Sequence, residues 1–269
     1  IATTTDVENY PGFPDGIMGP ELVGNMKKQA EKFGAEIRYE RATSFETDEK
    51  GMHIIKTDSN EYKTYALIIG TGASARWLGL EDEEKYKSRG VHTCATCDGA
   101  FYKDKSIIVV GGGDAACEEA DFLTKFASKV IMLIRKDKMR ASVPMIERVE
   151  ANSKIEIKYN SSIARYLGDD NGLTGVILKV NEEEVEQKID GVFLAIGHTP
   201  NTTIFTGKLD MDEMKYLITN KKTETNVPGV FAAGDVADHV FRQAITSAGT
   251  GSAAAIAAER YVAEKKHKA

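Results

Sequence analysis

The sequence predicts an α/β protein with two domains of related design. Residues 106–135 predict a strand, a glycine turn, a helix and a second strand, which is the order of a nucleotide-binding βαβ unit. Two apolar strands end in glycine in the same way, in "ALIIGTGA" and "VFLAIGHTP". The chain has 269 residues, which is enough for two ordinary domains.

The composition is that of a soluble globular protein, with 42% hydrophobic and 28% charged residues. A formal charge of −6 argues against non-specific nucleic-acid binding, which requires a basic surface. No apolar run approaches the roughly 20 residues that span a bilayer, so we expect no membrane among its partners. Three cysteines cannot form a disulfide framework, and this low count is typical of a reducing compartment such as the cytoplasm.

Helix and strand periodicities follow one another in the first part of the chain. Residues 20–33 carry apolar side chains at three- and four-residue spacing, which predicts an amphipathic helix. Residues 35–46 and 51–59 alternate apolar and polar side chains, which predicts antiparallel strands. "YALIIGTGA", residues 65–73, predicts a buried strand that runs into a glycine turn. The charged composition beyond residue 77 predicts a crossing between domains.

The second part of the chain begins with the βαβ unit and returns to the first domain near its end. Three later segments predict a second set of antiparallel strands: residues 154–169, 172–180 and 183–197. Near residue 198 we expect the chain to cross back, and it ends in an Ala-rich helix over 243–262. The predicted domains are therefore residues 1–77 together with 198–269, interrupted by a domain at 78–197.

The turn "VVGGGDAACEEA" has the spacing of a dinucleotide-binding site. Gly111, Gly113 and Ala116 stand in G-x-G-x-x-A spacing after an apolar strand and before a helix. Gly111 permits the tight turn, Gly113 lets the backbone approach a pyrophosphate, and Ala116 allows close helix–strand packing. The helix N-terminus presents free N–H groups to the phosphates. The alternative is a glycine turn that only connects two elements.

Cations follow the second strand, at the place where an acidic residue would bind the 2′-hydroxyl of NAD. Arg135 and Lys136 stand there, and Arg140 lies just beyond. Two or three positive charges at this place favour a 2′-phosphate, and therefore NADPH. A solvated basic turn without a ligand is the alternative.

The segment "HTCATCDGAF" contains Cys94 and Cys97 in C-x-x-C spacing. Zinc needs four ligands, and the chain has no second C-x-x-C and no histidine cluster with ligand spacing. A disulfide between such close residues stabilises little but exchanges readily, which favours a redox pair. Asp98 follows directly, where it can supply or accept the proton of thiol chemistry. We expect Cys117 to be a small apolar helix residue, and His92 to be a surface residue rather than one that tunes the thiolate.

The sequence resembles the low-molecular-weight, bacterial-type thioredoxin reductases. The matching segments run in the family's order over nearly the whole chain: "VENYPGFPDGIMGPEL", "ALIIGTGASARWLGL", "GVHTCATCDGAF", "VVGGGDAACEEA", "LIRKDKMRAS", "FLAIGHTPN" and "GVFAAGDVADHVFRQAITSAGTG". A C-x-x-C just before the glycine turn of the nucleotide domain separates this family from the glutathione-reductase relatives.

The resemblance implies two Rossmann-like, three-layer nucleotide-binding domains of the pyridine nucleotide-disulfide oxidoreductase type, one for FAD and one for NADPH, in a homodimer. It implies that electrons pass from NADPH to FAD, then to the disulfide, then to thioredoxin. Cys97 would face the flavin, Cys94 would exchange with thioredoxin, and Asp98 would act as the acid. The NADPH site would comprise Gly111, Gly112, Gly113, Asp114, Ala115, Arg135, Lys136 and Arg140. The FAD site would comprise Asn9, Asp235, Val236, Arg242, Gln243 and Ala244.

The sequence departs from the family's pattern in two places. The basic turn, usually His-Arg-Arg, is Ile134-Arg135-Lys136, so we expect NADPH with some loss of selectivity. The family's opening strand, glycine turn and helix, which bind the FAD pyrophosphate, have no counterpart before "VENYPG". We therefore expect a fragment that begins inside its first domain. The alternatives are the reductase component of a peroxide-scavenging system and a non-catalytic NADPH-binding module.

Overall fold

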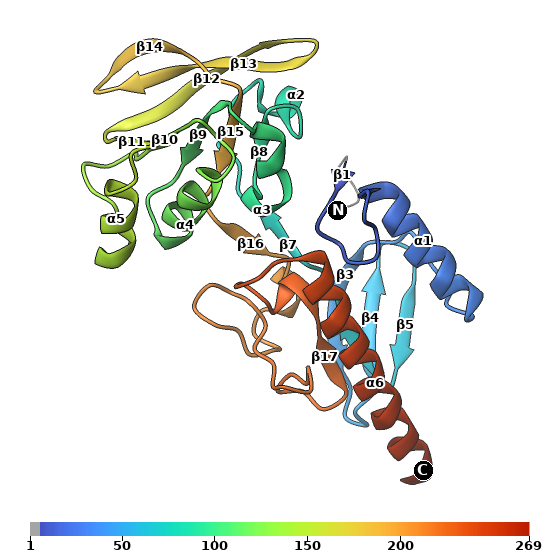
Figure 1. Ribbon diagram of the computed structural model, residues 1–269. Coiled ribbons are helices and arrows are strands. Elements are labelled where there is room, and N and C mark those ends of the chain that lie inside the picture. Colours follow the sequence, from blue (N-terminus) through green and yellow to red (C-terminus); the bar gives the residue numbers. More distant parts are fainter. Residues whose placement is uncertain (1–5, 269) are drawn as a thin grey trace. The chain divides into compact units, whose positions relative to one another are not determined.

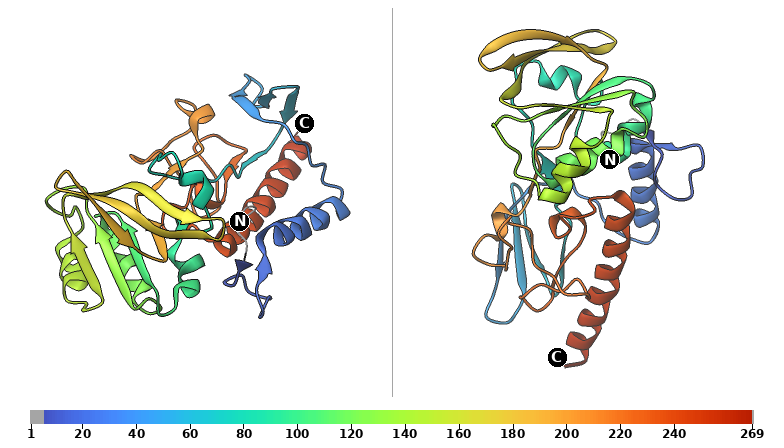
Figure 2. Two further views of the ribbon diagram at one scale, coloured as in Figure 1. Left: turned by 90° about the horizontal axis from the view of Figure 1, so that it is seen from above. Right: turned by 60° about the vertical axis from the view of Figure 1, so that its left-hand side comes forward.

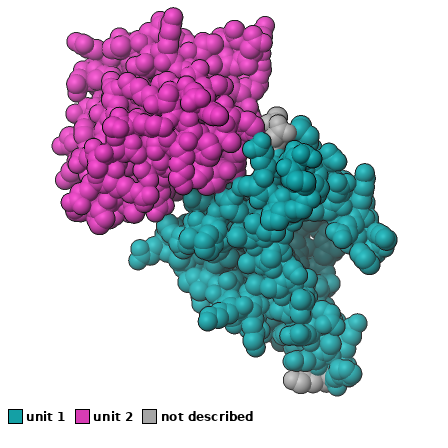
Figure 3. All heavy atoms as spheres, viewed as in Figure 1, with its two compact units in different colours: residues 1–74, 199–269 teal, residues 75–198 magenta. Residues whose placement is uncertain are grey.

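The chain folds into two compact units. The computed structural model describes residues 6–268, and Figure 1 shows the order of their helices and strands. Unit 1 comprises residues 1–74 and 199–269, and unit 2 comprises residues 75–198 (Figure 3). Two short strands, β7 (Ala73–Ala75) and β16 (His198–Pro200), lie where the chain passes from one unit to the other.

Unit 2 is built on a five-stranded parallel sheet in the order β11-β10-β9-β15-β8. Its strands are β8 (Val91–His92), β9 (Ser106–Val110), β10 (Lys129–Leu133), β11 (Ile155–Lys158) and β15 (Gly191–Leu194). The strands β9, β10 and β15 are continuous apolar runs and are buried on both faces. This is the pattern that a parallel sheet needs, because both of its faces are covered by other elements.

Helices cover one face of this sheet and a β-meander covers the other, which gives three layers (Figures 1 and 2). Ile107 and Val109 of β9 pack with the helices α4 (Asp114–Leu123) and α5 (Val143–Glu150). Ile108 and Val110 point to the opposite face, because successive side chains of a strand alternate. There they pack with the antiparallel strands β12 (Ser161–Asp169), β13 (Gly172–Val180) and β14 (Glu183–Lys188).

Three short helical segments complete unit 2: α2 (Glu83–Tyr86), α3 (Ala95–Asp98) and η1 (Gly99–Tyr102). The side chain of Glu83 is buried, and both of its carboxyl oxygens accept hydrogen bonds. Its Oε1 accepts hydrogen bonds from the Leu78 N–H, 3.1 Å away, and from the Tyr166 hydroxyl, 2.9 Å away. Its Oε2 accepts one from the Gly79 N–H, 2.9 Å away. Burial and the Glu83 charge raise the pKa of Tyr166, so this hydroxyl stays a donor.

Unit 1 combines a short parallel pair with an antiparallel sheet. The strand β6 (Leu67–Ile69) pairs in parallel with β17 (Val230–Ala232), and α6 (Ala244–Lys268) packs on this pair. The strands β3 (Ala42–Thr47), β4 (His53–Thr57) and β5 (Glu61–Thr64) form an antiparallel sheet. The remaining elements are β1 (Asp6–Val7), β2 (Ile17–Met18), α1 (Gly19–Lys32), η2 (Thr203–Phe205) and η3 (Gly234–Val236).

The structure corrects three of the expected strands. Residues 35–41 form no strand, and β3 begins only at Ala42. Residues 155–158 and 191–194 were expected in an antiparallel set, but β11 and β15 pair in parallel within the main sheet. Side chains alternate with a period of two in both parallel and antiparallel strands, so this period does not predict the direction in which two strands pair. None of the helices within residues 6–268 is long and apolar enough to span a bilayer.

Candidate active site

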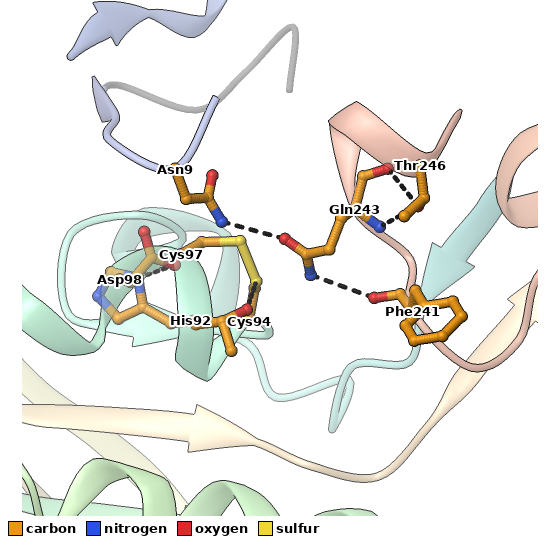
Figure 4. Close-up of a disulfide and its surroundings, with 9 residues drawn as sticks. Asn9, His92, Cys94, Cys97, Asp98, Phe241, Gln243 and Thr246 are labelled. Atoms are coloured by element: carbon orange, nitrogen blue, oxygen red, sulfur yellow. Dashed lines mark hydrogen bonds and ion pairs between the residues drawn. A yellow bond between two sulfur atoms is a disulfide. The ribbon is translucent and has the colours of Figure 1, made fainter. Parts of the chain in front are cut away.

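Cys94 and Cys97 form a disulfide at the start of α3 (Figure 4). The sulfur atoms are 2.03 Å apart and the Cα atoms 5.3 Å apart. The Cys94 carbonyl accepts hydrogen bonds from the N–H groups of Cys97, at 3.3 Å, and Asp98, at 3.2 Å. This turn brings the two sulfur atoms together. Both cysteines are half-buried, and their unequal roles remain a prediction.

Asp98, the acid that the sequence places beside the disulfide, is held by His92. The His92 Nδ1 lies 3.0 Å from the Asp98 Oδ2, and the His92 Nε2 lies 2.6 Å from the Tyr102 hydroxyl (Figure 4 shows the His92–Asp98 pair). His92 is only 8% exposed, so the expectation of a surface histidine is wrong. The reason is that β8 pairs with β15, which places His92 against Phe193 with the ring centroids 5.2 Å apart.

The glycine turn between β9 and α4 gives its glycines different environments. At Gly111 a Cβ atom would lie 2.4 Å from the Ala195 carbonyl oxygen and 2.8 Å from the Ala116 Cβ, and φ is +149°. At Gly113 a Cβ atom would meet nothing within 4 Å. Gly113 is also the N-cap of α4 and has no side chain to satisfy the first N–H groups of the helix. The chain itself needs Gly111, whereas Gly113 leaves open space before a helix N-terminus, as a pyrophosphate requires.

The expected basic segment is bonded to this turn through its backbone. The N–H groups of Arg140 and Ala141 donate to the Gly112 carbonyl, at 2.7 and 3.2 Å. The Asp114 Oδ1 accepts from the N–H and from the hydroxyl of Ser142, at 2.8 and 2.7 Å. These two bonds lower the pKa of Asp114, and they hold the segment against the start of α4. Sequence reasoning did not identify Ser142.

The three cations of this segment are free to bind an anion. Arg135, Lys136 and Arg140 are all exposed, and none forms an ion pair with another of residues 6–268. Ile134, which precedes them, is buried and packs over Gly112, where a Cβ atom would lie 3.2 Å from the Ile134 Cγ2.

The expected FAD residues gather in unit 1 from both ends of the chain. The Asn9 side-chain amide donates to the Gln243 Oε1 at 3.0 Å, and Figure 4 shows this bond. Asp235 lies in η3, half-buried, and its Oδ1 accepts from the Ser247 hydroxyl at 3.1 Å. Burial raises the pKa of Asp235, while Ser247 and Arg242 partly offset that shift. Ala244 begins α6, whereas the Val236 side chain is fully buried in the unit's own core, so only its backbone is available to a ligand.

Cys117 lies away from this chemistry, as expected. It is 1% exposed in α4, and its Sγ lies 3.8 Å from the Met139 Sδ. Burial raises the pKa of its thiol, which disfavours the reactive thiolate. The prediction of a packing residue is confirmed.

Comparison with known proteins gives a consistent result. A sequence profile of the pyridine nucleotide-disulphide oxidoreductases matches residues 2–251. The chain is 48% identical to the thioredoxin reductase of Coxiella burnetii and 47% identical to thioredoxin reductase 1 of Saccharomyces cerevisiae, in each case over 97% of this chain and 85% of the relative. The crystal structure of thioredoxin reductase from Streptococcus pyogenes superimposes with a TM-score of 0.91 at 37% identity, over 97% of this chain and 85% of that one.

The matched residues 2–251 lie in both units, and this range contains the C-x-x-C, the glycine turn and the segment that enters α6. The chain therefore belongs to the pyridine nucleotide-disulphide oxidoreductases and, within them, to the thioredoxin reductase family.

Proposed function

We propose that this chain is an NADPH-dependent thioredoxin-disulfide reductase that passes electrons through FAD and the Cys94–Cys97 disulfide to thioredoxin. The observation that carries the proposal is the placement of this disulfide beside an acid, within the unit that contains the dinucleotide turn. The thioredoxin reductases that the chain matches share that reaction by name. When bound, NADPH and FAD supply the two electrons that reduce the disulfide.

Unit 2 is the proposed NADPH domain. Its fit rests on the open space at Gly113 and on the uncapped start of α4, which suit a pyrophosphate. Gly112, Asp114 and Ala115 complete the turn, and Asp114 holds the following segment through Ser142. Arg135, Lys136 and Arg140 offer positive charge to the 2′-phosphate that distinguishes NADPH from NADH.

Unit 1 is the proposed FAD domain. Asn9 and Gln243 form one polar edge, and the segment from Asp235 to Ala244 leads into the N-terminus of α6. Asp235 fits a ligand that brings hydroxyl donors, because its carboxylate is half-buried and the Ser247 hydroxyl bonds only Oδ1. Ribityl and ribose hydroxyls of a flavin dinucleotide are donors of this kind.

Reductive exchange needs a thiolate, a resolving thiol and a proton donor. We assign these roles to Cys94, Cys97 and Asp98. The Cys94 thiol gives its proton to Asp98, and the resulting thiolate attacks one sulfur of the thioredoxin disulfide. That S–S bond breaks, and the leaving sulfur takes the proton back from Asp98. The Cys97 thiol then attacks Cys94 and loses its proton, which re-forms the Cys94–Cys97 disulfide and releases the second thioredoxin sulfur, which takes up that proton. Two electrons leave the cysteine pair, and its two protons end on the two thiols of thioredoxin.

We further propose a homodimer in a reducing compartment such as the cytoplasm. A reversible cysteine pair and a single buried free thiol suit a reducing environment. The helix α1 exposes apolar side chains, among them Val23 at 38% and Met26 at 39%, which suits a surface covered by a second chain. Light scattering that gives the mass of one chain at micromolar concentration contradicts the dimer.

Two serine variants test the exchange roles in the flavin-loaded protein. Cys97→Ser leaves Cys94 free but removes the resolving thiol, so we expect a stable covalent complex with thioredoxin on a non-reducing gel. Cys94→Ser leaves Cys97 without a partner, so we expect no such complex. Cys117→Ser is the matched control, because that thiol is buried, and it should turn over thioredoxin at the parent's rate. If both active-site variants reduce thioredoxin at the parent's rate, the disulfide is not the electron carrier.

A further inference from the structure

We propose that His92 is a positioning residue for Asp98: it orients the carboxyl group toward the redox disulfide through its Nδ1–H, and Tyr102 fixes it in the tautomer that can do so. This inference rests on the proposed disulfide exchange at Cys94 and Cys97. The three side chains form one continuous hydrogen-bonded row, since Asp98 lies 3.0 Å from His92 and His92 lies 2.6 Å from Tyr102.

The order of donors in this row follows from the chemistry of its two ends. The Asp98 Oδ2 accepts both when the carboxyl group is ionised and when it carries its exchangeable proton on the other oxygen, so the His92 Nδ1 carries the proton that points to Asp98. Burial, together with the charges of Asp98 and Asp190, raises the pKa of Tyr102, so its phenol keeps its proton. In the neutral imidazole, the Tyr102 O–H therefore donates to Nε2 and the Nδ1–H donates to Asp98.

The surroundings leave His92 little freedom to rotate. Its ring stacks on Phe193 and meets Tyr102 edge-on, with ring centroids 5.2 and 5.3 Å apart. Tyr102 is held in turn, because a Cβ atom at residue 191 would lie 2.3 Å from its ring. The His92 side chain is 7% exposed and that of Asp98 is 18% exposed, so water competes weakly for the bond between them.

Few charged groups in the described part of the chain surround the hydrogen-bonded row of Asp98, His92 and Tyr102. Asp98 and Tyr102 face His92 directly. Asp190 acts on Tyr102 from the segment before β15, and the Lys105 Nζ lies 5.3 Å from the centre of the Tyr102 ring. Phe193, the side chain packed on the other face of His92, is apolar. Asp98 is thus the acid to which the imidazole is bonded.

Positioning matters for one step of the exchange, the protonation of the leaving sulfur. An alkyl thiolate is a basic leaving group and gains from a well-placed acid, whereas an aromatic thiolate is a weak base and leaves without one. The attack by Cys94 is the same in both cases. A defect in positioning Asp98 should therefore slow exchange with an alkyl disulfide and spare exchange with an aromatic one.

The test uses the chain reduced with dithiothreitol and freed from it, reacted in stopped flow with 2-hydroxyethyl disulfide or with 5,5′-dithiobis(2-nitrobenzoate). The variant His92→Phe keeps a ring but loses the donor, and we expect alkyl exchange to slow about ten- to a hundredfold with aromatic exchange unchanged. His92→Asn offers an amide N–H near the place of Nδ1 and should restore most of the rate. His267→Phe, at an exposed site in α6, is the matched control and should leave both rates at the parent's value.

A double-mutant cycle separates positioning from a structural role. In an Asp98→Asn background, His92→Phe should cause no further loss of alkyl exchange, because the group it positions is gone. Equal slowing of both disulfides, or losses that add with Asp98→Asn, overturns the proposal. A second readout needs no variant: in the ¹⁵N spectrum of histidine-labelled parent chain, His92 should show a protonated Nδ1 and an unprotonated Nε2, and the opposite tautomer also overturns it.

These measurements require neither NADPH nor thioredoxin. If the proposed reductase function fails, no thioredoxin turnover is seen while the alkyl-specific effect of His92→Phe remains. If the positioning role fails, thioredoxin turnover persists and the alkyl-specific effect is absent.

Discussion

In the turn between β9 and α4, Gly111 and Gly113 should respond differently to substitution by alanine. Gly111→Ala should lower stability, whereas Gly113→Ala should weaken NADPH binding. Gly111→Ala places a methyl group 2.4 Å from the Ala195 carbonyl oxygen at a φ of +149°. Gly113→Ala places one where nothing lies within 4 Å. The two substitutions are chemically identical and lie two residues apart, so each is the control for the other.

The expected magnitudes follow from these surroundings. At Gly111, backbone strain of about 1–3 kcal/mol adds to an overpacking penalty of similar size, so unit 2 should lose at least about 2 kcal/mol of unfolding free energy. At Gly113 the chain itself meets no clash, so stability should change by less than about 0.5 kcal/mol. A bound pyrophosphate, however, needs the space that the new methyl group fills. A clash of about 1–3 kcal/mol weakens NADPH binding about five- to 150-fold.

The chain contains its own probe for the assay. Trp77 is its single tryptophan, and it packs against the apolar cluster between the sheet of unit 2 and the β-meander. Urea titrations followed by Trp77 fluorescence therefore report on unit 2, and calorimetric titration measures the dissociation constant for NADPH. The reasoning is refuted if Gly111→Ala unfolds at the parent's urea concentration, or if Gly113→Ala binds NADPH as tightly as the parent.

Two further predictions concern charge. Arg135→Gln together with Arg140→Gln should raise the dissociation constant for NADPH about ten- to a hundredfold and leave that for NADH unchanged, because only NADPH offers a 2′-phosphate to these exposed guanidinium groups; equal losses for both nucleotides in calorimetric titrations contradict the assignment. Asp235→Asn should raise the melting temperature of the flavin-free chain at neutral pH, because burial raises the pKa of Asp235 and its charged form therefore destabilises the folded state. The difference in melting temperature should vanish below pH 3.8, the ordinary pKa, where the carboxyl group is protonated in both the folded and the unfolded chain. An equal difference at both pH values argues against this prediction.

Local patterns in the sequence predicted the local parts of the structure. The strand, turn and helix around Gly111 were predictable because apolar runs, glycine spacing and helical periodicity all lie within one short segment. The helix α1 was predictable for the same reason, and it lies at Gly19–Lys32, close to the expected range. The direction of strand pairing was not predictable from local patterns, because β11 and β15 pair with strands that are distant in the sequence.

The candidate site shows the same division between local and distant information. Cys94, Cys97 and Asp98 are adjacent in sequence, and their chemistry is visible in their spacing. His92 was mistaken for a surface residue because its burial depends on Phe193, far along the chain, and on the pairing of β8 with β15. The role of Ser142 depends in the same way on a contact with Asp114, 28 residues away.

Because Cys117 is buried, the redox state of the C-x-x-C pair can be determined by counting the accessible thiols of the native chain. A thiol reagent added to the native oxidised chain finds both active-site sulfurs bonded to each other and the third enclosed beside Met139. After reduction, the same reagent reaches only the C-x-x-C pair. The number of thiols labelled per native chain therefore measures the fraction of chains whose C-x-x-C pair is reduced. Cys117, which becomes accessible in denaturant, serves as an internal standard for protein concentration.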